Sequence, residues 1–306
     1  MIETLLSLYI TAILQSNLDQ TLGFIQSPPQ SIIKTASYNL AQISENEIPP
    51  VKNPLMISPI IESKAGLAMD INSGTVLYEK NIHQRLKIAS ITKLMTIMII
   101  LEEDNLDEEV EVSANAAKTS GSVMYLKTNE VITIENLLYG ALIHSANDAA
   151  IALAEHNSGS VDKFVEKMND KALKLGLLNT HFSNPIGVDD KNNYSSAYDI
   201  AKLARYIYQK QFVKDTAQLK ELIVYSKDKS IKHDLKSTNE LLDSYLHIKG
   251  LKTGSTDGAG LCLVAIANDD SNDEILTVLL NSPNRFKETK ILIDWVFRAY
   301  NWQNNK

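Results

Sequence analysis

The chain has 306 residues, of which 44% are hydrophobic and 22% are charged, a composition typical of a globular protein with one large domain or two small ones. Lysine and arginine number 30 and aspartate and glutamate 37, so the net charge at pH 7 is −7. This balance disfavours non-specific binding to nucleic acid or anionic lipid, and we expect no nucleic-acid partner. The single cysteine, Cys262, excludes an internal disulfide.

The amino-terminal end carries an apolar run over residues 5–14. Its length is typical of the core of an export signal, but Glu3 precedes it and the first basic residue is Lys34. The run is shorter than the ~20 residues that a membrane-spanning helix needs. Three interpretations remain open: an atypical or truncated export signal, a membrane-proximal helix, or a packed helix.

Two proline pairs, at 28–29 and 49–50, stand among polar residues and indicate a tether. We therefore expect an amino-terminal segment and linker over residues 1–58 and one compact domain over residues 59–306.

Extended and helical patterns follow one another along this domain. Runs at 66–70 and 75–78 flank a turn and predict a hairpin. Ser90 then opens the apolar segment 91–101, which predicts a buried helix with Ser90 as its N-cap. Further helices are predicted around 137–142, 164–175 and 197–209, then strands at 248–252, 261–267 and 275–280, and a last helix over 285–300.

This order of elements predicts the fold class. Strands come first, helices next and strands last, so the fold is expected to be α+β, with the helical block as an insertion. Cys262 lies in the apolar strand 261–267 and is expected to be a buried core residue.

The sequence Ser90-Ile91-Thr92-Lys93 is the first candidate for chemistry. A lysine three residues after a serine on a helix brings its amine within reach of the hydroxyl, and serine needs such a base to act as a nucleophile. The alternative is that Ser90 only caps the helix and Lys93 is only solvated. Alone, this short motif is weak support for catalysis.

Two further motifs occur in a suggestive order. Ser145 and Asn147 stand at a predicted corner between two helices, and Lys252-Thr253-Gly254 closes a predicted strand. Each has an ordinary structural interpretation, as a helix cap or a strand end. Together with the first motif, on helix, corner and strand, they favour an acyl-transfer site.

With these motifs, residues 65–300 resemble the serine-type D-alanyl-D-alanine carboxypeptidases, the low-molecular-mass penicillin-binding proteins of peptidase family S11. Shorter matches add to the likeness, among them Thr180-His181-Phe182-Ser183-Asn184-Pro185 and Thr238-Asn239. The resemblance implies a β-lactamase/transpeptidase-like fold, an antiparallel sheet flanked by helices with an inserted helical subdomain. Residues 59–306 would then form the penicillin-binding catalytic domain.

The resemblance implies the chemical roles. Ser90 would attack the carbonyl between two terminal D-alanines, and neutral Lys93 would accept its proton. Ser145 would relay a proton to the departing amine. Lys93 can act in this way near neutral pH only if burial or a nearby cation such as Lys252 lowers its pKa.

The resemblance also implies how the substrate is held. Asn147 would bind a substrate amide, and Gly254 would let the substrate backbone approach the strand. The backbone N–H groups of Ser90 and Ser255 would surround the oxyanion. The substrate carboxylate would be bound by cationic or hydroxyl side chains, namely Lys252, Thr253 and Arg285.

The expected partners follow from this assignment: the peptidoglycan stem peptide as substrate and β-lactams as covalent inhibitors, at an extracytoplasmic site in the periplasm or cell envelope. Membrane association is expected only through the amino-terminal segment. No cofactor or metal is expected, because the histidines lack metal-ligand spacing. They are His83, His144, His156, His181, His233 and His247.

Alternative functions are a D,D-endopeptidase, a class A-like β-lactamase, and an inactive peptidoglycan-binding module. A Glu-x-x-Leu-Asn segment, which a class A enzyme uses for deacylation, is missing after the motif that contains Ser145 and Asn147. Three residues depart from the usual family pattern and put loop shape in question, namely Asn129, Ala146 and Gly258.

Overall fold

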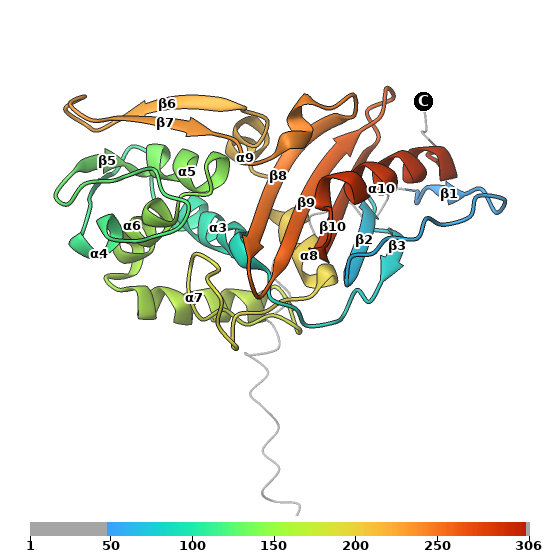
Figure 1. Cartoon of the computed structure of the whole chain (residues 1–306), viewed down its shortest axis with the longest axis horizontal. Coiled ribbons are helices and arrows are strands. Elements are labelled where there is room, and N and C mark those ends of the chain that lie inside the picture. Colours follow the sequence, from blue (N-terminus) through green and yellow to red (C-terminus); the bar gives the residue numbers. More distant parts are fainter. Residues whose placement is uncertain (1–47, 304–306) are drawn as a thin grey trace, which may run out of the picture. The chain divides into compact units, whose positions relative to one another are not determined.

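A five-stranded antiparallel sheet forms the centre of the structure, a computed structural model that describes residues 48–303 (Figure 1). Its spatial order is β3-β2-β10-β9-β8. The strands are β2 (Ala65–Asp70), β3 (Val76–Lys80), β8 (His247–Thr256), β9 (Gly260–Asn268) and β10 (Glu274–Ser282). The predicted hairpin and the three predicted late strands are confirmed, and β8 runs further than its apolar pattern indicated.

Side chains alternate between the two faces of this sheet, as the two-residue period of a strand requires. Along β9, the side chains that pack into the larger core are Cys262, Val264 and Ile266. The side chains of the other face, which pack under α10 (Arg285–Ala299), are Leu263, Ala265 and Ala267. Helix α8 (Ala197–Ile207) covers the first face. The α+β prediction and the burial of Cys262 are thus confirmed.

The helical block lies between β3 and β8 in the sequence. Its helices are η2 (Ala89–Thr92), α3 (Lys93–Glu103), α4 (Ala114–Ala117), α5 (Ile134–Ile143), α6 (Asn147–Ser158), α7 (Val161–Lys174), α8, α9 (Gln211–Thr216) and η3 (Glu240–Asp243). Helix α3 is buried over residues 93–100 and is contacted by α5, α6, α7 and α8. A helix that is apolar on all sides needs such cover. This burial holds the start of α3 rigidly beside the sheet.

Three short strand pairs were not predicted. They are β1 (Val51–Lys52) with β11 (Tyr300–Asn301), β4 (Glu109–Glu111) with β5 (Val131–Thr133), and β6 (Glu221–Tyr225) with β7 (Lys232–Lys236). The β6–β7 hairpin lies next to α5 (Figure 1). Strands of two to five residues carry too little alternation to stand out in a sequence.

The apolar run at 5–14 and most of the expected linker lie outside the described residues. The interpretations of that end, and the boundary after residue 58, stay predictions. Among residues 48–303, the helices all fall short of the length and hydropathy that crossing a bilayer would require.

Candidate active site

Ser90 lies in η2, a short 3-10 helix that leads directly into α3. The predicted N-cap role of Ser90 is wrong, because Thr92 occupies that position and makes no side-chain cap. The Ser90 hydroxyl oxygen instead lies 2.9 Å from Lys93 Nζ, within hydrogen-bond distance. The preceding residue, Ala89, has a φ of 48°, which is strained for a residue with a Cβ. The turn therefore directs the hydroxyl at the lysine amine.

Lys93 is the first residue of α3, and its side chain is completely buried. Its Nζ lies 2.9 Å from Ser90 Oγ, 2.7 Å from Asn147 Oδ1 and 2.9 Å from the carbonyl oxygen of Ile186. The two amide oxygens can only accept. A neutral amine has two N–H donors and one lone pair, so the donors go to these oxygens and the lone pair faces the Ser90 hydroxyl. The geometry fits a neutral lysine that accepts a proton from Ser90.

Two buried lysines determine the electrostatics of this site. Burial lowers the pKa of Lys93 well below its ordinary value, the charge of Lys252 lowers it further, and Asp148 opposes both. Burial also lowers the pKa of Lys252, to about 7, with a contribution from the charge of Arg285. Lys93, which the resemblance assigns as the base, therefore has the lowered pKa that this role would require.

Ser145 and Asn147 lie at the corner between α5 and α6. Ser145 has a φ of 61° and is 5% exposed, a conformation that is uncommon outside functional sites and turns. Asn147 Oδ1 accepts from Lys93, while its Nδ2 donates to the carbonyl oxygen of Ser120 (2.8 Å). Because both ends of this amide are engaged, Asn147 orients the Lys93 amine; its contact with a substrate amide stays a prediction.

The Lys-Thr-Gly motif, residues 252–254, lies in β8, one of the two edge strands of the sheet. A Cβ on Gly254 would lie 2.9 Å from the carbonyl oxygen of Ile88 and 3.1 Å from the amide nitrogen of Ser90. Glycine therefore allows β8 to pack directly against the nucleophile turn, which is residues 88–90.

Arg285 and Ser255 complete the predicted set. Arg285 is the first residue of α10, and its Nη1 donates to the carbonyl oxygen of Gly254 (2.8 Å). It adds positive charge beside the end of β8, near Lys252. Ser255 follows Gly254 in β8 and is exposed. The structure thus gathers the predicted residues at the start of α3 and the end of β8, and Ser145 lies two residues before Asn147, which contacts Lys93.

A loop that the sequence indicated only as a turn contributes to the site. The carbonyl oxygen of Ile186 accepts from Lys93, and that of Pro185 accepts from Thr96 Oγ1 (2.7 Å). Asn184 Oδ1 accepts hydrogen bonds from the backbone N–H groups of residues 186–188. The Asn-Pro pair was therefore the visible signal of a loop that contacts Lys93.

Two more residues of the site were missed. Gly187 has a φ of 87°, and a Cβ there would overlap the carbonyl oxygen of Ala89. Thr238 Oγ1 lies 2.5 Å from Thr253 Oγ1 and so orients a hydroxyl of the Lys-Thr-Gly motif. The sequence signal for Gly187 was a glycine after a turn, and that for Thr238 was a Thr-Asn pair. Neither signal indicated which residue the side chain or backbone would contact.

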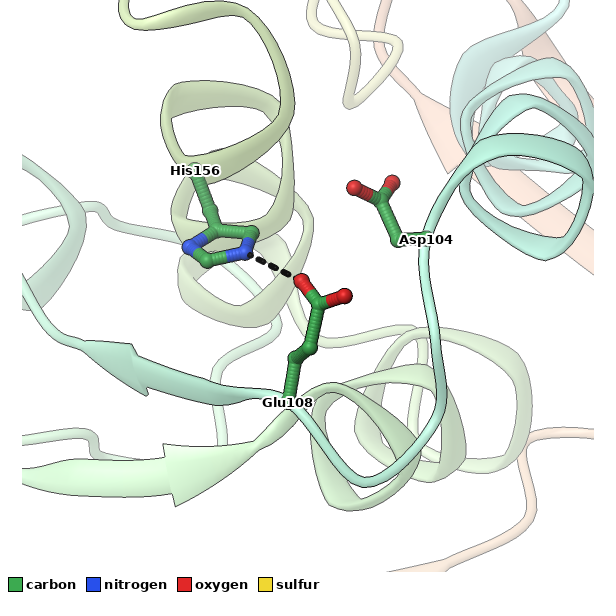
Figure 2. A group of neighbouring side chains, drawn as sticks. All are labelled: Asp104, Glu108 and His156. Carbon is green, nitrogen blue, oxygen red and sulfur yellow. Dashed lines mark hydrogen bonds and ion pairs between the residues drawn. The ribbon is translucent and has the colours of Figure 1, made fainter.

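One group among the described residues has the composition of a metal site, namely Asp104, Glu108 and His156 (Figure 2), whose potential ligand atoms lie within 4.8 Å of one another. His156 Nε2 lies 3.4 Å from Glu108 Oε2, and Asn157 Nδ2 donates to Asp104 Oδ2 (2.7 Å). Asp104 follows the last turn of α3, roughly 16 Å of helix from Lys93. The group is separate from the nucleophile turn.

Comparison with known proteins gives a consistent family. The sequence model of the family described as D-alanyl-D-alanine carboxypeptidase matches residues 53–284. The D-alanyl-D-alanine carboxypeptidase DacF of Bacillus subtilis is 36% identical over 247 residues, covering 78% of this chain and 63% of the relative. DacC of Escherichia coli is 33% identical over 260 residues, covering 79% and 63%. The chain thus spans less than two thirds of the length of these curated relatives.

Solved structures agree with this comparison. The crystal structure of the Streptomyces K15 DD-transpeptidase superposes with a TM-score of 0.75 at 30% identity, covering 79% of this chain and 100% of that chain. Penicillin binding protein 5 from Haemophilus influenzae gives a TM-score of 0.72 at 35% identity, covering 79% and 72%. The predicted transpeptidase-like fold is confirmed.

Proposed function

Because this chain belongs to the D-alanyl-D-alanine carboxypeptidase family, we propose that it is a serine D,D-carboxypeptidase that removes the terminal D-alanine from peptidoglycan stem pentapeptides. The observation that carries the proposal is the set of contacts of Lys93 Nζ, with two obligatory acceptors and the Ser90 hydroxyl around one buried amine.

Acylation begins when Ser90 Oγ attacks the penultimate D-alanine carbonyl and its proton passes to the lone pair of Lys93. The oxyanion that forms is held by the backbone N–H groups of Ser90 and Ser255. The amide C–N bond then breaks, and the departing amine takes the proton from Lys93 through the Ser145 hydroxyl. The products of this step are free D-alanine and an ester on Ser90.

Recognition of the free carboxylate explains why a carboxypeptidase needs a second lysine. Lys252 is 1% exposed, and its Nζ donates one hydrogen bond within the described chain, to the carbonyl oxygen of Thr253 (3.2 Å). A buried cation without an anionic partner is costly, and a substrate carboxylate relieves that cost. The hydroxyl of Thr253, oriented by Thr238, and the charge of Arg285 add to this binding site.

Deacylation returns the enzyme to its starting state. Lys93, neutral again, accepts a proton from water as the water oxygen attacks the ester carbonyl. The bond from the carbonyl carbon to Ser90 Oγ breaks, and Ser90 recovers its proton from Lys93. Because no lactamase-type glutamate follows the middle motif, we expect the penicillin adduct to be long-lived. A fast β-lactamase and an inactive module are not favoured, given the intact Ser90, Lys93 and Lys252.

The proposed location follows from the proposed substrate. A peptidoglycan stem peptide lies outside the cytoplasmic membrane, so the enzyme acts in the periplasm or cell envelope, with β-lactams as covalent inhibitors. Any membrane association is proposed to occur through the amino-terminal segment.

The proposal is tested by covalent labelling of the purified full chain with a fluorescent penicillin, followed by intact-mass measurement. Wild type should gain one adduct, Ser90→Ala none, and Ser271→Ala, an exposed serine outside the site, should label like wild type. Equal labelling of Ser90→Ala would overturn the nucleophile assignment.

Product analysis then tests the reaction type. Wild type should release D-alanine from a pentapeptide ending in D-Ala-D-Ala, at a rate that Ser90→Ala reduces to background. Cleavage of purified cross-linked muropeptides without release of D-alanine from the pentapeptide would instead identify an endopeptidase.

A further inference from the structure

Three separate segments meet at the side chain of Asp189. Its Oδ1 accepts a hydrogen bond from Thr256 Oγ1 (2.9 Å), and its Oδ2 accepts from the backbone N–H of Gly258 (2.8 Å). Lys87 Nζ, from the segment that enters the nucleophile turn, lies 3.6 Å from Oδ1. Asp189 itself belongs to the loop whose Ile186 carbonyl binds the catalytic lysine. The side chain thus connects that loop to the turn that ends β8.

Gly258, which departs from the usual family pattern, fits this connection. A Cβ at position 258 would lie 2.6 Å from Lys87 Nζ and 2.7 Å from Asp189 Oδ1. A side chain at this position would therefore displace the carboxylate from the backbone N–H that it accepts from. The departure permits a contact between the loop and the turn.

The two connected segments, the loop at 184–189 and the end of β8, both pack against the nucleophile turn. On one side, Gly187 packs so closely on the carbonyl group of Ala89 that no Cβ fits. On the other, Gly254 packs on the amide nitrogen of Ser90. Asp189 lies two residues beyond Gly187, and Thr256 lies two residues beyond Gly254. The hydrogen bond between Asp189 and Thr256 therefore connects the loop and β8 close to the points where each packs on the nucleophile turn.

We propose that Asp189 is a positioning residue that fixes the distance between the backbone N–H groups of Ser90 and Ser255, the two donors of the oxyanion hole. The inference rests on the proposed function, since it assumes an acyl-transfer reaction at Ser90. Oxyanion stabilisation depends steeply on where the donors point. Ser255 immediately precedes Thr256, so a shift of the Thr256 contact moves that donor directly.

Hydrogen-bond geometry carries this role more than charge does. Lys87 and Asp189 have side chains that are 39% and 31% exposed, and ion pairs exposed to this extent contribute little. The two short hydrogen bonds to Thr256 and Gly258 are directional, and Thr256 Oγ1 also accepts from the backbone N–H of Ala259 (3.1 Å). This second bond fixes the rotamer from which Thr256 donates.

The test is a double-mutant cycle on the full chain with Asp189→Ala, Thr256→Val and the pair. The readouts are the acylation rate constant for a penicillin, the infrared carbonyl stretch of the acyl-enzyme, and Tm. We expect Asp189→Ala and Thr256→Val each to slow acylation by at least about tenfold, since a misplaced group costs up to ~10²-fold. The double variant should be no slower than the slower single variant, because both break one contact.

The infrared measurement separates positioning from a general structural role. Weaker hydrogen bonding to the ester carbonyl raises its stretching frequency, so the frequency should rise in both single variants. Thr256→Ser keeps the hydroxyl donor and should restore the rate and frequency. Asp190→Ala, a neighbour that accepts from Asn192 N–H (2.7 Å), is the control and should match wild type.

Three results would overturn the inference. The first is acylation by Asp189→Ala within twofold of wild type, and the second is a multiplicative loss in the double variant. The third is a lowered Tm with an unchanged carbonyl frequency, because it would indicate a purely structural contact. Failure of the proposed function is a different outcome, since wild type would then form no adduct at all.

Discussion

Lys93 and Lys252 are buried in one site, and a positive charge on Lys252 disfavours a positive charge on Lys93. Desolvation penalises both charged forms, and the charge of Lys252 lowers the pKa of Lys93 further. In the proposed reaction Lys252 is the cation that binds the substrate carboxylate, and Lys93 is the neutral base. The proposed carboxylate-binding cation would therefore also favour the deprotonated form of the proposed base.

We expect kcat/KM for a D-Ala-D-Ala peptide to follow a bell-shaped pH profile, because this ratio reports the free enzyme. The rate should rise with pH as Lys93 loses its proton at its lowered pKa. It should fall above pH about 7, where Lys252 loses the charge that binds the carboxylate. A stopped assay of D-alanine release from pH 5 to 10 measures both limbs.

The matched variant for this profile is Lys252→Arg. A guanidinium does not deprotonate in proteins, so the alkaline limb should move to higher pH or disappear, although the different side-chain geometry lowers the maximum rate. An alkaline limb at the same pH in this variant would assign that limb to another group.

Glycines determine how closely secondary elements pack around the nucleophile turn. Gly254 lets β8 pack against it, and Gly187 lets the 184–189 loop pack against it from the other side. Gly187 also has a positive φ, which a residue with a Cβ adopts at a cost. Gly159, which ends α6, has a similar φ of 76° but no atom within 4 Å of a would-be Cβ.

We expect Gly187→Ala to slow penicillin acylation by about 10²-fold or more, because the loop that carries the Ile186 carbonyl must move away from Lys93. Gly159→Ala carries the same backbone strain, on the order of 1–2 kcal/mol, and should acylate at the wild-type rate. Stopped-flow acylation and urea unfolding measure the two effects separately. Equal acylation rates in the two variants would contradict a role for the close approach of Gly187 to the carbonyl group of Ala89.

At the scale of the whole described domain, a buried polar pair attaches the β6–β7 hairpin to the helical block. His233 Nε2 lies 2.7 Å from Glu130 Oε1, and His233 Nδ1 lies 2.8 Å from the carbonyl oxygen of Met124. Asp148 holds the backbone N–H of Met124 from the other side (3.0 Å) and is adjacent to Asn147 in α6. The pair thus supports the segment around Met124, which packs beside the corner between α5 and α6.

This pair should make folding stability depend on pH. Burial lowers the pKa of His233, but the hydrogen bonds to Glu130 and Met124, together with the negative charges of Glu130 and Asp148, outweigh it, so the net pKa is raised. A raised pKa in the folded state means stabilisation that is complete below the ordinary value of about 6.5 and is lost as pH rises through the folded-state pKa.

Glu130→Gln removes the charge but leaves an amide that can donate to a neutral imidazole. The difference in unfolding free energy between wild type and Glu130→Gln should therefore shrink as pH rises above about 6.5. Urea unfolding of both proteins from pH 6 to 9 measures it, and the lowered pKa values of Lys93 and Lys252 cancel in the difference. A difference that does not change with pH would contradict this role of His233.

Much of the fold followed from local patterns. The long helices and the strands of the central sheet have clear periodicity, so the hairpin at 66–78, the buried strand around Cys262 and the last helix were predicted close to their observed bounds. The short β6–β7 hairpin was not predicted, because its strands have only five residues each and the exposed face of β6 carries the apolar side chains of Ile223 and Tyr225. Ser90 was misassigned as an N-cap, because the 3-10 turn that displaces the helix start to Lys93 has no distinct sequence signal.

The residues of the candidate site divide in the same way. Ser90 and Lys93 could be named in advance because their spacing on one helix implied a chemistry, and Asn147 and the Lys-Thr-Gly motif because the resemblance to a known family implied their roles. The partners of these residues could not: the Ile186 carbonyl, the Thr238 hydroxyl and the Asp189 carboxylate come from loops far away in the sequence. Hydrogen bonding and burial depend on which distant segments the fold brings within about 3 Å. The motifs therefore indicated the candidate reacting groups, and tertiary contacts alone determined that Lys93 is buried, oriented by Asn147 and Ile186, and lowered in pKa.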